Sequence, residues 1–227
     1  MAPRFNIYVK AASDGKSVGD CPFSQRVNMY ARLKIPADQF TLIPVDISNK
    51  PPEFLSLNPA GTVPVFEDTE KNVVIADSAK ITAYIHELFP EPDLQQNYNG
   101  PAVEACSGIF PKLAAFLKNK DPSATPALRE ALEEELTKLD TYLQSGGCQG
   151  KYLLCDTVSE LDCSILPKLR HVQVAAKYFQ KFEIPEKLTA LQKYIKDGQS
   201  CEVFQQTACK DEEIIKGWSR HGLVKVD

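Results

Sequence analysis

A single cysteine near the amino terminus stands in a setting typical of a nucleophile. Cys21 follows a Gly-Asp pair and precedes Pro22 in the stretch GDCPFSQR. Because proline is favoured in the first turn of a helix, we expect Cys21 at a helix amino terminus. Unsatisfied N–H groups and the helix dipole stabilise a thiolate there, and the thiolate is the form that attacks electrophiles. Most free cysteines of soluble proteins are instead buried apolar residues, but this local sequence favours the nucleophile.

Two charged residues are expected beside this thiol. Lys10, at the end of the first predicted strand, would bring positive charge to the same edge of the sheet. Asp20 opposes a thiolate unless its carboxylate is turned toward a substrate or a basic partner. The sequence leaves the direction of that carboxylate open.

The residue one turn after Cys21 is a hydroxyl. A dithiol oxidoreductase carries its resolving cysteine three residues after the nucleophile, but this chain has Ser24 there, which cannot form a disulfide. We therefore expect a thiol from outside the chain to resolve any oxidised form of Cys21. Glutathione is the obvious candidate.

Two further short stretches suggest a site for a peptide-like thiol. Val63-Pro64 begins a predicted strand, where a cis peptide would turn the Val63 backbone toward a ligand, although most such bonds are trans. Ser78, at a predicted helix start, could hold a carboxylate while Asp77 accepts an ammonium. Plain helix capping explains Ser78 equally well. The cysteine, the Val-Pro pair and the Asp-Ser pair are more specific together than any one alone.

The seven cysteines indicate reduced thiols rather than a disulfide or metal framework. Their number is odd, and they form no C-x-x-C pair or Cys/His cluster at zinc spacing. We expect a cytosol-like compartment, no metal and no permanently bound cofactor. The sequence assigns no role to six of these cysteines: Cys106, Cys148, Cys155, Cys163, Cys201 and Cys209.

Charge and hydropathy exclude several function classes. The chain has 26 basic and 30 acidic residues, a net charge of -4, and so no basic footprint for nucleic acid. Its first residues, MAPRFNIYVKAA, resemble neither a signal nor a transit segment, and nowhere do 18 consecutive apolar residues occur. We expect a cytoplasmic protein without stable membrane insertion.

The first 90 residues alternate between strand and helix patterns. Apolar periodicity and turn signals predict strands at 5–9, 40–45, 63–66 and 73–75, with helices at 23–31, 53–57 and from Ser78 to Pro90. This order, βαβαββα, indicates a small α/β domain over residues 1–90 with a mixed four-stranded sheet.

The rest of the chain is predicted to be helical. Residues 91–100 carry turn formers without periodicity and are interpreted as a linker. Residues 101–227 then form an all-helical domain, with helical spacing at 101–118, 126–143, 159–179, 187–196 and 211–217. Ser159 and Asp162 have the spacing of a capping box.

Over essentially its whole length the sequence resembles the plant and algal dehydroascorbate reductases of the glutathione transferase superfamily. The stretches YVKAA, VGDCPFSQRV, NPAGTVPVFED, ADS, PKLRHVQVA, FEIPEKLT and IIKGW carry the resemblance. CPFSQR and the PKL to IPEKLT region are shared with chloride intracellular channel proteins and place only the superfamily. The resemblance implies a thioredoxin-like domain followed by a helical one, in a monomer.

The resemblance also implies roles in the first domain. Cys21 would be the nucleophile, and Lys10 and Asp20 would contact both dehydroascorbate and glutathione. Lys50 and the Val63-Pro64 backbone would hold the glutathione peptide. Asp77 and Ser78 would hold its γ-glutamyl end.

Further roles fall in the second domain. The resemblance implies that His171 and Trp218 approach glutathione, whereas the residues themselves indicate a satisfied interhelical histidine and a core or tail-docking tryptophan. His221 is a departure, because the family commonly has a lysine near this point. We expect His221, or Arg220, to replace that lysine in contact with dehydroascorbate.

The expected reaction is a monothiol ping-pong reduction of dehydroascorbate by glutathione through Cys21. The oxidised cysteine, a sulfenic acid, would form a mixed disulfide with one glutathione, and a second would release glutathione disulfide. Two alternatives stay open: a redox-switched, membrane-associating relative of chloride intracellular channels, and an omega-type glutathione transferase or thioltransferase.

Overall fold

The chain forms two compact units. The structure, a computed structural model, describes residues 3–98, 100–145, 150–223 and 225. The first unit comprises Met1–Leu94 together with Glu202–Glu213, and the second comprises Gln95–Cys201 and Ile214–Asp227. A short segment from late in the sequence therefore completes the first unit.

The first unit is built on a mixed four-stranded sheet. Its elements run β1 (Phe5–Lys10), α1 (Pro22–Lys34), β2 (Phe40–Val45), α2 (Pro52–Leu57), β3 (Val65–Asp68), β4 (Val73–Ile75) and α3 (Ser78–Leu88). The strand order is β2-β1-β3-β4, with β1 parallel to β2 and the other pairs antiparallel. The predicted βαβαββα order and mixed sheet are confirmed.

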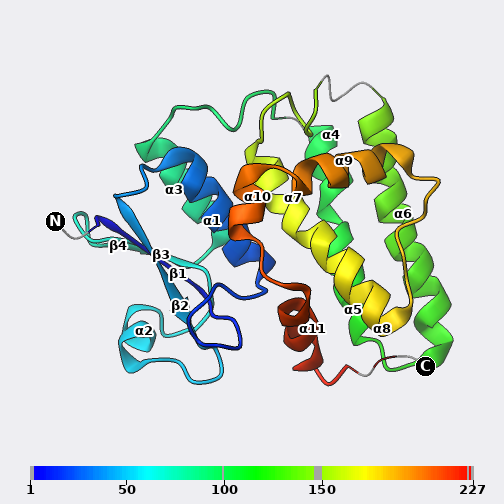
Figure 1. The fold of residues 1–227 in the computed structure, drawn as a ribbon, viewed down its shortest axis with the longest axis horizontal. Helices are drawn as coiled ribbons and strands as arrows, with labels where there is room; N and C mark the ends of the chain where they lie inside the picture. The colour runs from blue at the N-terminus through cyan, green and yellow to red at the C-terminus, as the bar shows by residue number, and fades with distance from the viewer. Residues whose placement is uncertain (1–2, 99, 146–149, 224, 226–227) are drawn as a thin grey trace. The chain divides into compact units, whose positions relative to one another are not determined.

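Alternation along β1 directs side chains to both faces of this sheet. Phe5, Ile7 and Val9 are fully buried, and the Phe5 ring meets Phe89 just after α3. Tyr8 points the other way and packs on Phe54 of α2. Helices α1 and α3 therefore cover one face while α2 covers the other (Figure 1).

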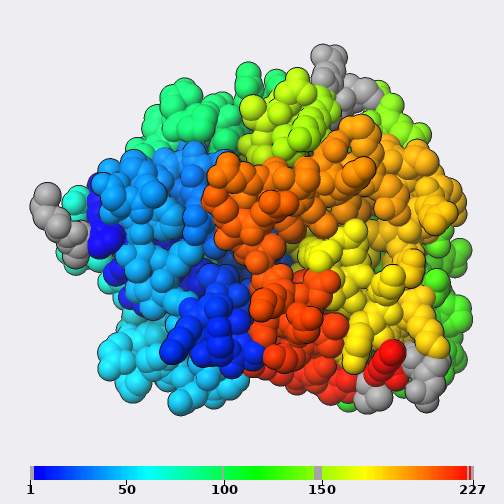
Figure 2. Space-filling model, in the orientation of Figure 1, coloured from blue at the N-terminus to red at the C-terminus, as the bar shows by residue number. Residues whose placement is uncertain are grey.

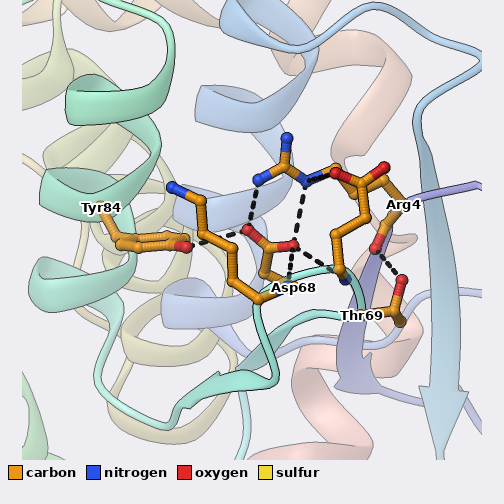
Figure 3. Close-up of polar contacts among 6 residues, drawn as sticks. Arg4, Asp68, Thr69 and Tyr84 are labelled. Carbon is orange, nitrogen blue, oxygen red and sulfur yellow. Dashed lines mark hydrogen bonds and ion pairs between the residues drawn. The ribbon is translucent and has the colours of Figure 1, made fainter.

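A buried carboxylate at the end of β3 links this sheet to α3. Asp68, at the end of β3, accepts hydrogen bonds from Arg4 Nε at 3.0 Å and Nη2 at 2.6 Å, and from the Tyr84 hydroxyl at 2.9 Å (Figure 3). The Arg4 guanidinium lowers the pKa of Asp68 to about 2. The ion pair thus stays charged at neutral pH and joins β1, β3 and α3.

Helix α10 (Glu202–Thr207) belongs to the first unit and was not predicted. It packs on α1, and Gln25 Nε2 donates to Thr207 Oγ1 at 3.4 Å. Further along, Ser13 N donates to the Glu213 carboxylate at 2.7 Å. Figure 2 shows the orange atoms of this late segment beside the blue atoms of the amino-terminal residues. The segment Glu202–Glu213 therefore contacts both α1 and the loop that precedes α1.

The second unit is helical, as predicted. Its longer helices are α4 (Gly100–Ser107), α5 (Ile109–Lys118), α6 (Thr125–Gln144), α7 (Glu160–His171), α9 (Thr189–Gln199) and the later part of α11 (Asp211–Ser219). The predicted helix over 101–118 was wrong at Gly108, where the chain divides into α4 and α5. The buried Glu135 carboxylate occupies the place that a side chain at position 108 would need.

The predicted helix over 159–179 also differs from the structure. It consists of α7, a π-helical turn (Val172–Ala176) and the short α8 (Lys177–Gln180). The capping box at its start is confirmed, because the Ser159 and Asp162 side chains each accept from the other's backbone N–H. Asp162 is fully buried and also accepts from Leu153 N at 3.1 Å and the Tyr194 hydroxyl at 2.6 Å.

Candidate active site

Cys21 is the N-cap residue of α1. Its backbone is extended, with φ -69 and ψ 114, and Pro22 opens the helix. The Cys21 carbonyl accepts from Gln25 N at 3.0 Å, while its side chain makes no capping hydrogen bond with the residues described. The thiol is partly exposed. It thus lies at the positive end of the helix dipole and is not used to hold the helix.

Asp20 is paired with Lys10. Lys10 Nζ lies 2.6 Å from Asp20 Oδ1, and only 11% and 10% of the two side chains are exposed. Gly19 makes this approach possible, because its N–H donates to the Lys10 carbonyl at 2.7 Å and a Cβ there would collide with the Ala11 backbone. The carboxylate beside Cys21 therefore faces a basic partner, which resolves the question that the sequence left open.

Ser24 has a structural contact. Its side chain is fully buried, and its hydroxyl accepts from Lys10 N at 3.3 Å. The residue where a dithiol enzyme carries its second cysteine thus joins the first turn of α1 to the end of β1. This bond helps to set Cys21 and Lys10 side by side at one edge of the sheet.

The loop between α2 and β3 carries the next group of predicted residues. The Val63-Pro64 peptide is cis. Asn58 Nδ2 donates to the Thr62 carbonyl at 2.9 Å and fixes the loop from inside. Lys50 lies against Gly61, whose φ of +62 and lack of a side chain leave room for it. Lys50, from the segment before α2, therefore lies against the loop that carries Val63.

The predicted residues Asp77 and Ser78 lie at the start of α3. Asp77, not Ser78, is the N-cap of α3, because its carboxylate accepts from Ala79 N at 3.1 Å and Lys80 N at 2.9 Å. Ser78 is buried, and its hydroxyl accepts from Arg26 Nη1 at 3.3 Å. Sequence reasoning missed Arg26, because nothing local links the second turn of α1 to the start of α3.

His171 and Trp218 form a pair within the second unit. Trp218 Nε1 donates to His171 Nδ1 at 2.9 Å, and both side chains are buried. The ring of Phe110 packs on both, and the His221 ring centroid is 5.7 Å from that of Trp218. The reading of His171 as a satisfied interhelical histidine fits these contacts. Contacts of His171, Trp218 or His221 with a substrate stay predictions.

The other cysteines lie in different surroundings. Cys106 and Cys163 are buried, whereas Cys155, Cys201 and Cys209 are partly exposed, and none of the five forms a disulfide with a described residue. Burial raises the pKa of both Cys106 and Cys209 to about 12, and nearby carboxylates act in the same direction. Cys148 lies outside the described residues.

The part of the chain that the structure describes carries neither a cluster of metal ligands nor a membrane-spanning helix. No group of three or more His, Cys, Asp or Glu side chains there is placed to hold a metal ion. No helix among these residues combines the length and apolar character of a membrane span.

Comparisons with known proteins agree with the division of the chain into two units. Family models for the N-terminal and C-terminal domains of glutathione S-transferase match residues 20–88 and 122–197. A rice (Oryza sativa subsp. japonica) protein described as "Probable glutathione S-transferase DHAR1, cytosolic" is 37% identical over 214 residues, covering 94% of this chain and 96% of that protein. Another rice protein, "Probable glutathione S-transferase DHAR2, chloroplastic", is 37% identical over 204 residues, covering 88% and 70%.

A solved structure extends the likeness. The crystal structure of Chlamydomonas reinhardtii dehydroascorbate reductase has a TM-score of 0.86 and 32% identity, covering 97% of this chain and all of that one. The glutathione transferase fold is therefore confirmed, and the chain belongs to the dehydroascorbate reductases of the glutathione S-transferase family.

Proposed function

We propose that this chain reduces dehydroascorbate to ascorbate with two molecules of glutathione, through the single thiol of Cys21. The observation that carries the proposal is the set of contacts made by the side chains in the first turn of α1. Cys21 is a partly exposed N-cap residue whose side chain forms no capping bond with the residues described, while Ser24 is buried and bonded to β1. The site therefore offers one reactive thiol and no second thiol one turn away.

In the first half-reaction, the Cys21 thiol and one water reduce dehydroascorbate. The carbonyl compound takes two electrons and two protons to become ascorbate, and the water oxygen stays on sulfur as a sulfenic acid. Lys10, ion-paired with Asp20 at 2.6 Å, would neutralise the oxyanion that develops on the substrate. The pair thereby supplies both a positive charge and a proton relay beside the nucleophile.

In the second half-reaction, glutathione restores the thiol. One glutathione condenses with the sulfenic acid to form a mixed disulfide and water, and a second attacks that disulfide to release glutathione disulfide. Glutathione would be held by Lys50 and the Val63-Pro64 backbone along its peptide, and by Asp77 and Ser78 at its γ-glutamyl end. These residues all belong to the first unit.

The test compares wild-type protein with Cys21→Ser in a glutathione-dependent assay of dehydroascorbate reduction. We expect kcat to fall by about a thousandfold or more, because the nucleophile is lost. Cys155→Ser is the matched control, since Cys155 is also partly exposed but lies in the other unit, and it should keep wild-type turnover. Turnover retained by Cys21→Ser would contradict the proposal.

The same preparation separates the alternatives. An omega-type transferase or thioltransferase would turn over glutathionylated or aromatic electrophiles faster than dehydroascorbate. A redox-switched channel relative would bind liposomes after oxidation and show negligible reductase turnover. We also propose a monomer located in the cytoplasm, which size-exclusion chromatography and imaging of a fluorescent fusion would test.

A further inference from the structure

The contact between Arg26 and Ser78 joins two parts of the first unit that the sequence separates by 52 residues. Arg26 Nη1 donates to Ser78 Oγ at 3.3 Å, and α1 packs along α3. Arg26 lies five residues after Cys21 on the same helix. The helix that carries the thiol at its start thus also reaches the residue proposed to hold the far end of glutathione.

The direction of this hydrogen bond constrains the Ser78 hydroxyl. A serine hydroxyl has one proton to donate and two lone pairs that accept. Because one lone pair faces the guanidinium, the hydroxyl proton is directed away from Arg26. A hydroxyl polarised by a cation behind it is a stronger donor, and a carboxylate is the acceptor that gains most from it.

The groups next to Ser78 are engaged in the helix cap or carry the wrong charge for binding a ligand carboxylate. The Asp77 carboxylate already accepts from Ala79 N and Lys80 N, so these two N–H groups are committed to the cap of α3. Asp77 also places negative charge beside the site, which would repel a ligand carboxylate. The guanidinium of Arg26, hydrogen-bonded to Ser78, offsets that charge.

We propose that Arg26 is a positioning residue that orients the Ser78 hydroxyl toward the carboxylate of the γ-glutamyl group and so sets the specificity for glutathione. This inference rests on the proposed function. Arg26 acts through Ser78, and its effect is confined to the half-reaction that consumes glutathione.

The experiment exploits the independence of the two half-reactions. In a ping-pong scheme, kcat/KM for dehydroascorbate reports only the reduced enzyme, and kcat/KM for glutathione reports only the oxidised one. For Arg26→Ala we expect kcat/KM for glutathione to fall about tenfold, the scale of one hydrogen bond to a charged group. The value for dehydroascorbate should stay within about twofold, because Ser78 does not take part in that half-reaction.

Three further measurements separate positioning from a structural role. Cysteinylglycine, which lacks the γ-glutamyl group, should serve wild type and Arg26→Ala equally well as thiol donor. In a Ser78→Ala background, Arg26→Ala should have no further effect, because the group it orients is gone. Arg26→Lys keeps the charge without the planar guanidinium and should lose only about threefold in kcat/KM for glutathione.

Arg32→Ala is the matched control on the same helix. Arg32 Nε donates to Asn28 at 3.0 Å on a surface that includes Gln206, and this variant should keep both kcat/KM values. If Arg26→Ala fails to fold, Arg26→Lys alone decides the question.

The inference is overturned by an equal fall in both kcat/KM values, by the same fall with cysteinylglycine, or by additivity with Ser78→Ala. Unchanged glutathione kinetics in Arg26→Lys and Arg26→Ala would also overturn it. The proposed function would be contradicted by different results. These are a wild-type protein without glutathione-dependent turnover, or a Cys21→Ser variant that retains this turnover.

Discussion

Helices α1 and α7 begin in opposite ways. At α7, Ser159 and Asp162 satisfy each other's backbone N–H groups, and both side chains are buried. At α1, the N-cap is Cys21, whose thiol makes no capping bond with the described residues, and the first turn carries no acidic side chain. Serine and aspartate are preferred N-caps, and cysteine is not among the preferred residues. The start of α7 is therefore built for stability, whereas the start of α1 leaves the Cys21 thiol out of the cap.

Two cysteines, Cys106 and Cys21, show a similar contrast between a buried and an accessible side chain. Cys106, within the second unit, is buried, and burial raises its pKa to about 12 while Asp162 adds negative charge. Cys21 is partly exposed at a helix amino terminus. The same side chain is thus kept protonated and inert in one place and accessible in the other, which is why cysteine content alone does not locate a reactive thiol.

The largest effect should come from removing the capping carboxylate of α7. Asp162→Ala leaves the N–H groups of Ser159 and Leu153 and the Tyr194 hydroxyl without their acceptor in a buried site. We expect the free energy of unfolding to fall by about 3 kcal/mol or more, measured by urea denaturation. Asp197→Ala, which removes a surface ion pair with Lys193, should cost less than about 1 kcal/mol. A loss below 1 kcal/mol for Asp162→Ala would show that the α7 start does not carry this stability.

A smaller effect is expected from Ser24→Ala. The substitution removes the acceptor of the Lys10 N–H in a buried position, and we expect a loss of about 1–2 kcal/mol in unfolding free energy. Ser56→Ala, on exposed α2, removes a hydroxyl that donates to the Pro52 carbonyl and should be nearly neutral. Equal stability of Ser24→Ala and wild type would contradict the anchoring role of Ser24.

The smallest effect has the opposite sign. Cys21→Ser replaces an N-cap that makes no capping bond by a preferred one, so this variant should gain about 0.5–1 kcal/mol in unfolding free energy. Ser159→Ala, the reverse change at α7, should lose about 1 kcal/mol. If Cys21→Ser unfolds at lower urea than wild type, the cysteine contributes to stability and the contrast between the two helix starts is wrong.

The periodicity of apolar residues predicted most of the helices and strands, because these elements bury one regular face. The strands at 40–45 and 73–75 were predicted at the bounds observed, and the helix of the first unit that opens at Ser78 also begins there. Helix α10 was missed because it spans only Glu202–Thr207, too short for a clear repeat. The Glu135 carboxylate that fills the space beside Gly108 comes from another helix, and no local pattern reveals it.

The site was predicted by residue type rather than by contact. The place of Cys21 at a helix start follows from Pro22 and the local turn, and the structure confirms that place. The partner of Asp20 and the acceptor of Arg26 are set by tertiary packing between β1, α1 and α3. Likewise, both Asp77 and Ser78 can cap a helix, and only the backbone geometry selects Asp77. Local sequence therefore predicts which chemical groups are present but not which of them contact one another.

The most direct test of the central claim is to follow Cys21 itself through one turnover by mass spectrometry. Reduced protein is mixed with one equivalent of dehydroascorbate without glutathione, and a sulfenic acid reagent then traps the product before digestion. We predict that the Cys21 peptide carries the trapped oxygen, one ascorbate appears per chain, and one equivalent of glutathione converts the untrapped protein to a Cys21 mixed disulfide. Release of ascorbate with an unmodified Cys21 peptide would contradict the assignment of Cys21 as the thiol that dehydroascorbate oxidises.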